Sequence, residues 1–156
     1  PQSPDVLGAE RADFLVSANA GQPPRPLRKI ASGGELSRIS LAIEVAALGL
    51  DAVPTMVFDE VDSGIGGAVA AAVGAKLRAL GATRQVLCVT HQPQVAAAGH
   101  AQYRVSKAAQ DGITQSAVEA LDAEGRIGEI ARMLGGAEVT KEAQAAAKKL
   151  LADVLP

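Results

Sequence analysis

The sequence predicts an α/β fold with a parallel sheet core and flanking helices. Two short apolar runs, Thr55–Phe58 and Gln85–Thr90, enclose a helical pattern of apolar residues over 68–80. This strand–helix–strand order is typical of parallel sheets. The length of 156 residues is enough for one buried core, and 48% hydrophobic with 21% charged residues fits a globular domain.

The N-terminal third predicts a short strand over 13–17, a proline-rich loop and then a helix. Pro23, Pro24 and Pro26 exclude a helix or a central strand over 22–27. Ser32 and Glu35 fit a capping box that begins a helix. Apolar residues at helical spacing then form one stripe, and these are Leu36, Ile39, Ile43, Ala46 and Leu50.

The remaining elements follow from similar patterns. The unbroken apolar run at 55–58 predicts a strand covered on both faces. Pro93 begins a short helix that reaches Ala98. Residues 101–107 and 113–121 are expected to pair as antiparallel strands, and helices are expected over 124–134 and 140–155.

Composition excludes several classes of function. A net charge of -2 and only three aromatic residues predict no general attraction to nucleic acid. No apolar run approaches the ~20 residues of a membrane span, and the first residues do not resemble a signal peptide. No membrane partner is therefore expected. The single cysteine, Cys88, has no intrachain disulfide partner, which fits a reducing cytoplasm.

Two adjacent carboxylates, Asp59 and Glu60, stand where an apolar strand ends, at the edge where open α/β sheets bind ligands. Neighbouring side chains on a strand point to opposite sides, so the two acids can have different roles. In phosphoryl transfer one carboxylate serves Mg²⁺ and the other orients the attacking water. The alternative is a solvated acidic turn.

A glycine turn and a histidine complete the candidate site. Ser32, Gly33 and Gly34 precede a helix, whose free N–H groups and positive dipole end favour a phosphate, although taken alone such a pattern is more often a simple helix cap. His91 follows the second strand, where it would contact a γ-phosphate or hold the water-orienting glutamate. A lone histidine there is more often structural, and His100 has no such context.

The order and spacing of these motifs resemble ABC-type ATPases of the SMC and Rad50 class. Ala31–Glu35 resembles the ABC signature, and Met56–Glu60 resembles Walker B with its catalytic glutamate. Asp62–Gly64 resembles the D-loop, and Thr90-His91 the switch histidine. The longer strings around these motifs are most similar to DNA repair members of the class.

The resemblance implies roles for individual residues. Ser32, Gly33, Gly34 and Glu35 would bind ATP held by a second head. Asp59 would hold Mg²⁺, while Glu60 and His91 would be catalytic. Asp62 and Ser63 would form a D-loop that contacts the other head of a homodimer. DNA would be bound through the full-length, nucleoid-associated protein.

The sequence contains no P-loop, Gly-x-x-x-x-Gly-Lys-Ser/Thr. In the family this motif lies near the N-terminus, and a long coiled coil separates it from the signature. We therefore expect residues 1–156 to be the C-terminal lobe of a head, beginning just after the coiled coil. The partner of this lobe would be the Walker A half of the same protein. Without that half, the lobe would bind ATP poorly and hydrolyse it negligibly.

The favoured function is part of an ATP-hydrolysing protein of DNA double-strand-break repair or recombination, in which head dimerisation gates DNA binding or tethering. The alternatives are the C-terminal part of an ABC transporter nucleotide-binding domain and a non-catalytic interaction module. A basic cluster of Arg25, Arg28, Lys29 and Arg38 would touch DNA, line a solvated face or lie near the phosphates.

Overall fold

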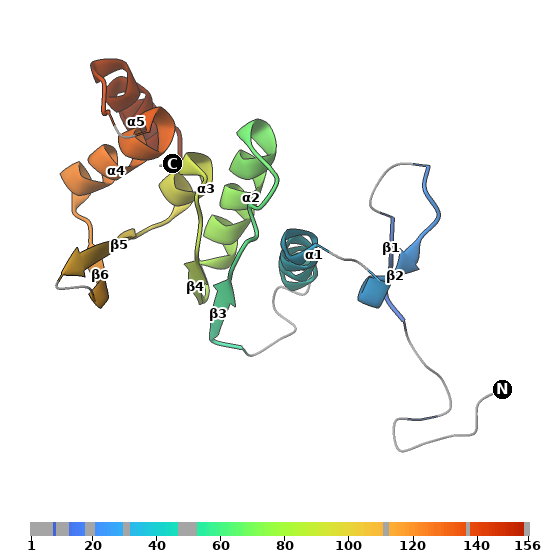
Figure 1. Ribbon diagram of the computed structural model, residues 1–156. Coiled ribbons are helices and arrows are strands. Elements are labelled where there is room, and N and C mark those ends of the chain that lie inside the picture. The colour runs from blue at the N-terminus through green and yellow to red at the C-terminus, as the bar shows by residue number, and fades with distance from the viewer. Residues whose placement is uncertain are drawn as a thin grey trace.

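The computed structural model describes residues 8, 13–17, 21–29, 32–46, 53–110, 113–136 and 138–154. Figure 1 shows the arrangement of the elements. In chain order they are β1 (Leu15–Val16), β2 (Arg25–Pro26), the 3-10 helix η1 (Leu27–Lys29), α1 (Gly33–Ala46), β3 (Thr55–Phe58), α2 (Gly67–Leu80), β4 (Gln85–Cys88), α3 (Pro93–Ala98), β5 (Tyr103–Gln110), β6 (Ile113–Ala120), α4 (Ala123–Gly135) and α5 (Lys141–Val154).

The predicted strand–helix–strand unit is present. Strands β3 and β4 pair in parallel, with Thr55 opposite Gln85 and Phe58 opposite Cys88, and α2 connects them. Among the described residues, however, this sheet has only two strands. The chain is therefore a mixed α/β structure with one small parallel pair, rather than one with an extended parallel sheet.

The prediction that β3 is covered on both faces is wrong for the described part of the chain. Met56 and Phe58 are buried in the core, but Val57 between them is 67% exposed. Because strand side chains alternate between faces, one face of the β3–β4 pair packs inward and the other is open. An apolar run does not reveal whether its own chain covers both faces.

Two hydrophobic clusters meet at α3. The first joins α1, β3, α2 and α3, with Phe58, Val61 and Leu80 among its buried members. The second joins α3, α4 and α5 around Ile130 and Ala147. Figure 1 shows α3 between α2 and the α4–α5 pair, in agreement with this packing. The first cluster supports the edge of the sheet where the candidate site residues lie.

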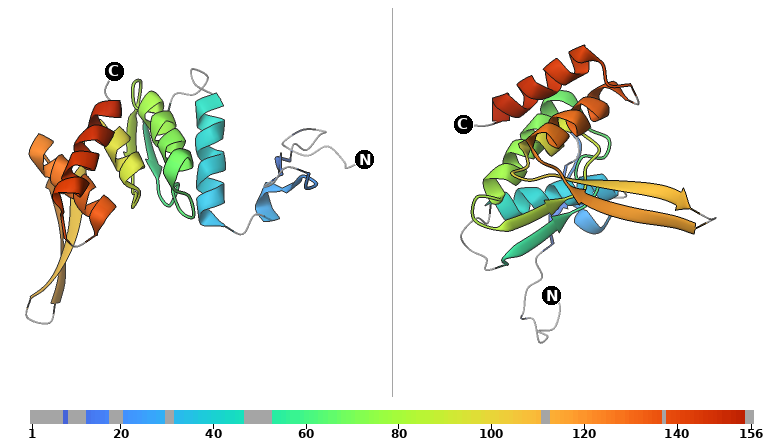
Figure 2. Two further views of the ribbon diagram at one scale, coloured as in Figure 1. Left: turned by 90° about the horizontal axis from the view of Figure 1, so that it is seen from above. Right: turned by 90° about the vertical axis from the view of Figure 1, so that its left-hand side faces the viewer.

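The predicted hairpin is present as β5 and β6, paired antiparallel from Tyr103↔Ala120 to Gln110↔Ile113. Figure 2 shows the hairpin extending away from the helices. Tyr103, Val105 and Val118 are each at least 60% exposed, so the described part of the chain provides little cover for it.

The N-terminal elements are short. Strands β1 and β2 form an antiparallel pair of two residues each, and β2 lies within the proline-rich segment as an edge strand. The helix expected from Ser32 begins at Gly33, but Leu50, at the expected end of its stripe, lies outside the described residues. Within the described residues, no helix combines the length and apolar character needed to cross a membrane.

Candidate functional site

The glycines of the signature-like motif pack against the turn that follows β3. Gly34 is buried, and a Cβ atom added there would lie 2.9 Å from Ser63 Cβ and 3.0 Å from the Glu60 carbonyl oxygen. A Cβ atom on Gly33 would lie 3.0 Å from Glu60 Oε2. The start of α1 therefore contacts the carboxylate turn so closely that only glycine fits at Gly34.

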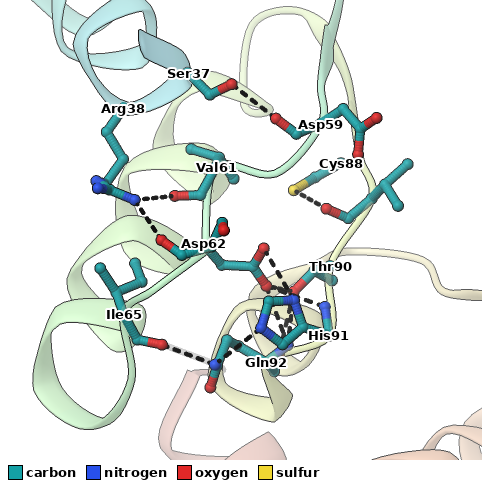
Figure 3. A network of polar contacts seen from close by, with 12 residues as sticks. Ser37, Arg38, Asp59, Val61, Asp62, Ile65, Cys88, Thr90, His91 and Gln92 are labelled. Atoms are coloured by element: carbon teal, nitrogen blue, oxygen red, sulfur yellow. Dashed lines mark hydrogen bonds and ion pairs between the residues drawn. The ribbon is translucent and has the colours of Figure 1, made fainter. Parts of the chain in front are cut away.

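Two further residues of α1 hold this turn by hydrogen bonds. Ser37 Oγ donates to the Asp59 carbonyl at 2.7 Å, and Arg38 donates to the Ser63 carbonyl at 2.8 Å (Figure 3). Gly34 and Arg38 are four residues apart, which places them on one face of the helix. Arg38 is half-buried, so it is not part of a solvated basic face.

The other basic residues named from the sequence lie elsewhere. Arg25 and Lys29 are exposed, on β2 and η1 respectively. The side chain of Arg28 lies outside the described residues. The proposed basic cluster is thus divided, because Arg38 points to the turn after β3.

Asp59 and Glu60 are both exposed at the carboxyl end of β3. Glu60 has a φ of 56°, the left-handed conformation that costs non-glycine residues about 1–3 kcal/mol. A hydrogen bond from the Ser63 amide to the Glu60 carbonyl, 3.0 Å long, closes the turn. This conformation directs the chain from the strand end back toward α1.

Ser32 and Glu35 form one half of the expected capping box. Ser32 is exposed directly before α1, and the Glu35 amide donates to Ser32 Oγ at 3.4 Å, a long contact. Within the described residues, the Glu35 side chain makes no return hydrogen bond. The capping box is therefore incomplete.

Asp62 is the polar centre of the site, with only 1% of its surface exposed. Its Oδ2 atom accepts hydrogen bonds from the Thr90 hydroxyl, the His91 amide at 3.0 Å and the Gln92 amide at 3.1 Å. Figure 3 shows these contacts joining the turn after β3 to the loop after β4. Since its carboxylate contacts its own chain, contact with a second head would involve other atoms of the turn.

His91 lies at the same end of the sheet as Asp59, as expected from the parallel strands. Its side chain is 66% exposed, and Nδ1 lies 3.6 Å from Asp62 Oδ1. Within the described residues, no hydrogen bond or ion pair joins His91 to Glu60. The ring is therefore anchored at the sheet edge and accessible to a ligand.

Negative charge concentrates at this edge. Burial, and then the nearby carboxylates of Asp62 and Asp59, raise the pKa of the Cys88 thiol to about 12. The thiol is protonated at neutral pH and has little nucleophilic character. Cys88 is consequently a packing residue of β4.

The carboxylates of Asp59 and Glu60 could supply some, but not all, of the ligands of a hard cation such as Mg²⁺. Asp59 and Glu60 supply exposed carboxylate oxygens, which Mg²⁺ prefers, and Mg²⁺ commonly uses one or two carboxylates together with phosphates and water. Within the described residues, no group of three His, Cys, Asp or Glu side chains could hold a metal ion. Nucleotide, water or other protein groups would have to complete the coordination.

The structure brings the sequence-predicted residues together in two groups. Gly33 and Gly34 meet Glu60 and Ser63, while Asp62 meets His91. Nothing in the sequence indicated a role for Ser37 or Gln92, and its pattern of charges placed Arg38 in a basic cluster instead of against the turn after β3. The spacing of Arg38 from Gly34 was the available signal, since helical neighbours of a tightly packed glycine share its contacts.

Comparisons with known proteins found close relatives for nearly the whole chain. It is 71% identical over 151 residues to the DNA repair protein RecN of Xylella fastidiosa, strain Temecula1, and 53% identical over 145 residues to RecN of Vibrio cholerae. These matches cover 97% and 93% of this chain but only 27% and 26% of the relatives. The chain thus spans about a quarter of the length of the curated relatives it matches.

A solved structure shares the fold. It comes from work on ATP-driven dimerization and DNA stimulated activation of SMC ATPases, with a TM-score of 0.52 and 21% identity. The match covers 76% of this chain and 71% of that one. A search against protein-family models found no match.

Proposed function

Since this chain is a homologue of about a quarter of the DNA repair protein RecN, we propose that it is the signature and Walker B lobe of an ABC-type ATPase head. The observation that carries the proposal is the single network joining α1, the turn at 59–63 and the loop at 90–92. In it, Gly33 and Gly34 stand beside Glu60, and Asp62 holds the His91 loop.

In the proposed site each residue has a separate task. Asp59 would hold Mg²⁺, which would supply charge neutralisation of the phosphates. Glu60 orients the attacking water, and His91 contacts the γ-phosphate. Ser32, Gly33 and Gly34 present the start of α1 to ATP bound by a second head.

The open face of the β3–β4 pair is evidence that a further lobe of the same head packs against it. Val57 is 67% exposed, and Leu87, its partner on β4, is 47% exposed. Val89, directly after β4, is 63% exposed. Exposed apolar patches of this kind mark interfaces. We propose that the Walker A half of the protein, which supplies the P-loop lysine, packs here.

We propose that the complete protein is a cytoplasmic, nucleoid-associated ATPase of double-strand-break repair or recombination, in which ATP-driven head dimerisation gates DNA binding. Homology to RecN over 97% of the chain favours this function over that of a transporter domain. One observation argues against the alternative of a non-catalytic module. Glu60 adopts the costly left-handed conformation and lies beside the glycines of α1.

The test is Glu60→Gln in the complete protein. Loss of the water-orienting carboxylate should lower kcat for ATP hydrolysis by about 10²–10⁴-fold, while ATP affinity stays within a few-fold. Phosphate release and nucleotide binding measure the two effects. Glu138→Gln, at an exposed position outside the helices, is the matched control and should leave kcat unchanged.

Unchanged turnover in Glu60→Gln would remove Glu60 from the mechanism and favour the non-catalytic module. The 156-residue chain alone should hydrolyse ATP negligibly, because its sequence has no P-loop lysine for the β- and γ-phosphates. Multiple turnovers by the isolated chain would contradict the proposed division of the site.

A further inference from the structure

The two ring nitrogens of His91 face chemically different partners. On one side, Nδ1 lies 3.6 Å from Asp62 Oδ1. On the other, Nε2 lies 3.3 Å from the side-chain amide nitrogen of Gln92. Figure 3 shows the ring between Asp62 and Gln92. A neutral imidazole carries one proton, and these partners determine which nitrogen carries it.

The Gln92 contact indicates that Nε2 is the unprotonated nitrogen. The amide Nε2 of Gln92 donates to the Ile65 carbonyl at 2.8 Å, which fixes the orientation of the carboxamide. A carboxamide nitrogen donates hydrogen bonds and accepts none. The ring nitrogen facing its second N–H must therefore offer a lone pair.

The Asp62 contact indicates independently that Nδ1 carries the proton. Oδ2 already accepts three hydrogen bonds from the loop at 90–92, whereas Oδ1 is buried and has no hydrogen-bond partner among the described residues. A lone pair on Nδ1 would repel this carboxylate oxygen. A proton on Nδ1 would be attracted to it and needs only a shift of a few tenths of an ångström to form a hydrogen bond.

We infer that Asp62 is a positioning residue that selects the Nδ1–H tautomer of His91. The carboxylate fixes the loop through Oδ2 and orients the ring through Oδ1. Nε2 is then the nitrogen that carries the lone pair, and in this structure that lone pair faces the Gln92 amide. Its use toward nucleotide or water rests on the proposed function, but the tautomer itself does not.

The test is ¹⁵N NMR of the imidazole nitrogens in the 156-residue chain at about pH 8.5, where a histidine is ordinarily neutral. The expected result is a proton on Nδ1 of His91. The signals are assigned by His100→Gln, since the chain has two histidines. A proton on Nε2 in the unsubstituted chain would overturn the inference, whatever any variant does.

Asp62→Asn provides a second arm. The carboxamide oxygen can still accept from Thr90, His91 and Gln92, while its NH₂ group takes the place of Oδ1 and donates to the ring. Because the Gln92 amide would still oppose a proton on Nε2, the substitution is made together with Gln92→Met, and the His91 proton should then move from Nδ1 to Nε2. A folded Asp62→Asn/Gln92→Met chain with an unmoved proton would contradict the role of Asp62.

Asp122→Asn is the matched control, because Asp122 caps α4 away from this network and asparagine caps helices equally well. It should leave the His91 signals unchanged. The measurement uses no nucleotide, so its result does not depend on the ATPase proposal. The inference about the His91 tautomer can fail while the proposed ATPase function holds, and the ATPase proposal can fail while the tautomer inference holds.

Discussion

At the scale of the residue, the signature-like glycines have a structural role within their own chain. Gly34 allows α1 to approach the turn at 60–63 more closely than any side chain permits. Glu60 adopts a left-handed conformation at the same contact. The residues that would act on nucleotide are thus held by a tight backbone contact, so their geometry depends on Gly34.

Gly34→Ala should therefore destabilise the chain. The added Cβ would clash with Ser63 Cβ and the Glu60 carbonyl, and overpacking of this kind costs about 1–3 kcal/mol. Gly128→Ala is the control, because a Cβ there meets nothing within 4 Å inside α4 and should stabilise the helix by about 0.5–1 kcal/mol. Urea denaturation gives both free energies of unfolding. Equal stability of Gly34→Ala and the unsubstituted chain would refute the tight contact.

The position of the site residues at one edge of the sheet was predictable from the sequence, but the hydrogen bonds between them were not. Asp59 and His91 follow apolar runs, so parallel strands place them at one edge. The bonds from Asp62 to the 90–92 loop depend on tertiary packing across 28 to 30 residues, for which no local pattern exists. The roles assigned to Asp59, Glu60 and His91 remain proposals.

At the scale of the element, α3 depends on a residue from α4. Arg126 donates to three carbonyls at the end of α3, those of Ala97, Gly99 and His100, at 2.7–3.3 Å. Burial, and then repulsion from Arg78, lower the pKa of Arg126, yet it remains a cation at neutral pH. The guanidinium satisfies backbone groups that the short helix leaves unpaired, and so attaches α4 to the end of α3.

Arg126→Met should lower the free energy of unfolding by about 2 kcal/mol, because hydrogen bonds from a charged donor are lost while the apolar stem is kept. Arg104→Met is the comparison, since Arg104 pairs with Glu119 on the exposed hairpin at 2.7 Å and such pairs contribute about 0–1 kcal/mol. Thermal and urea unfolding of both variants measure the difference. If the two substitutions cost the same, Arg126 does not have this role.

The helices and strands were more predictable than their surroundings. An unbroken apolar run located β3 at 55–58, and a starting proline located α3 at 93–98, both with the observed bounds. The apolar run could not reveal that Val57 is exposed, because burial of the second face depends on groups beyond the strand. The two-residue strand β2 also escaped prediction, because the prolines of this segment indicated a loop, whereas Pro26 lies in an edge strand, where proline is tolerated.

At the scale of the whole molecule, the proposed catalytic site is divided between two heads. The structure combines one parallel strand pair with helices in a fold similar to that of an SMC ATPase. The relatives are about four times as long as the matched segment. In the proposal, Ser32 and the α1 glycines complete the site of a second head, whereas Asp59 and Glu60 act on nucleotide in their own.

The most direct test is sedimentation velocity of the complete protein carrying Glu60→Gln, compared with the double variant Glu60→Gln/Ser32→Arg. Each variant is measured with and without ATP. We expect an ATP-dependent dimer that Ser32→Arg abolishes, because the bulky cation blocks the start of α1. Ser40→Arg, at an exposed position later in α1, is the control and should leave the dimer intact. Dimerisation that is unaffected by Ser32→Arg, or that ATP does not promote, would contradict the shared site.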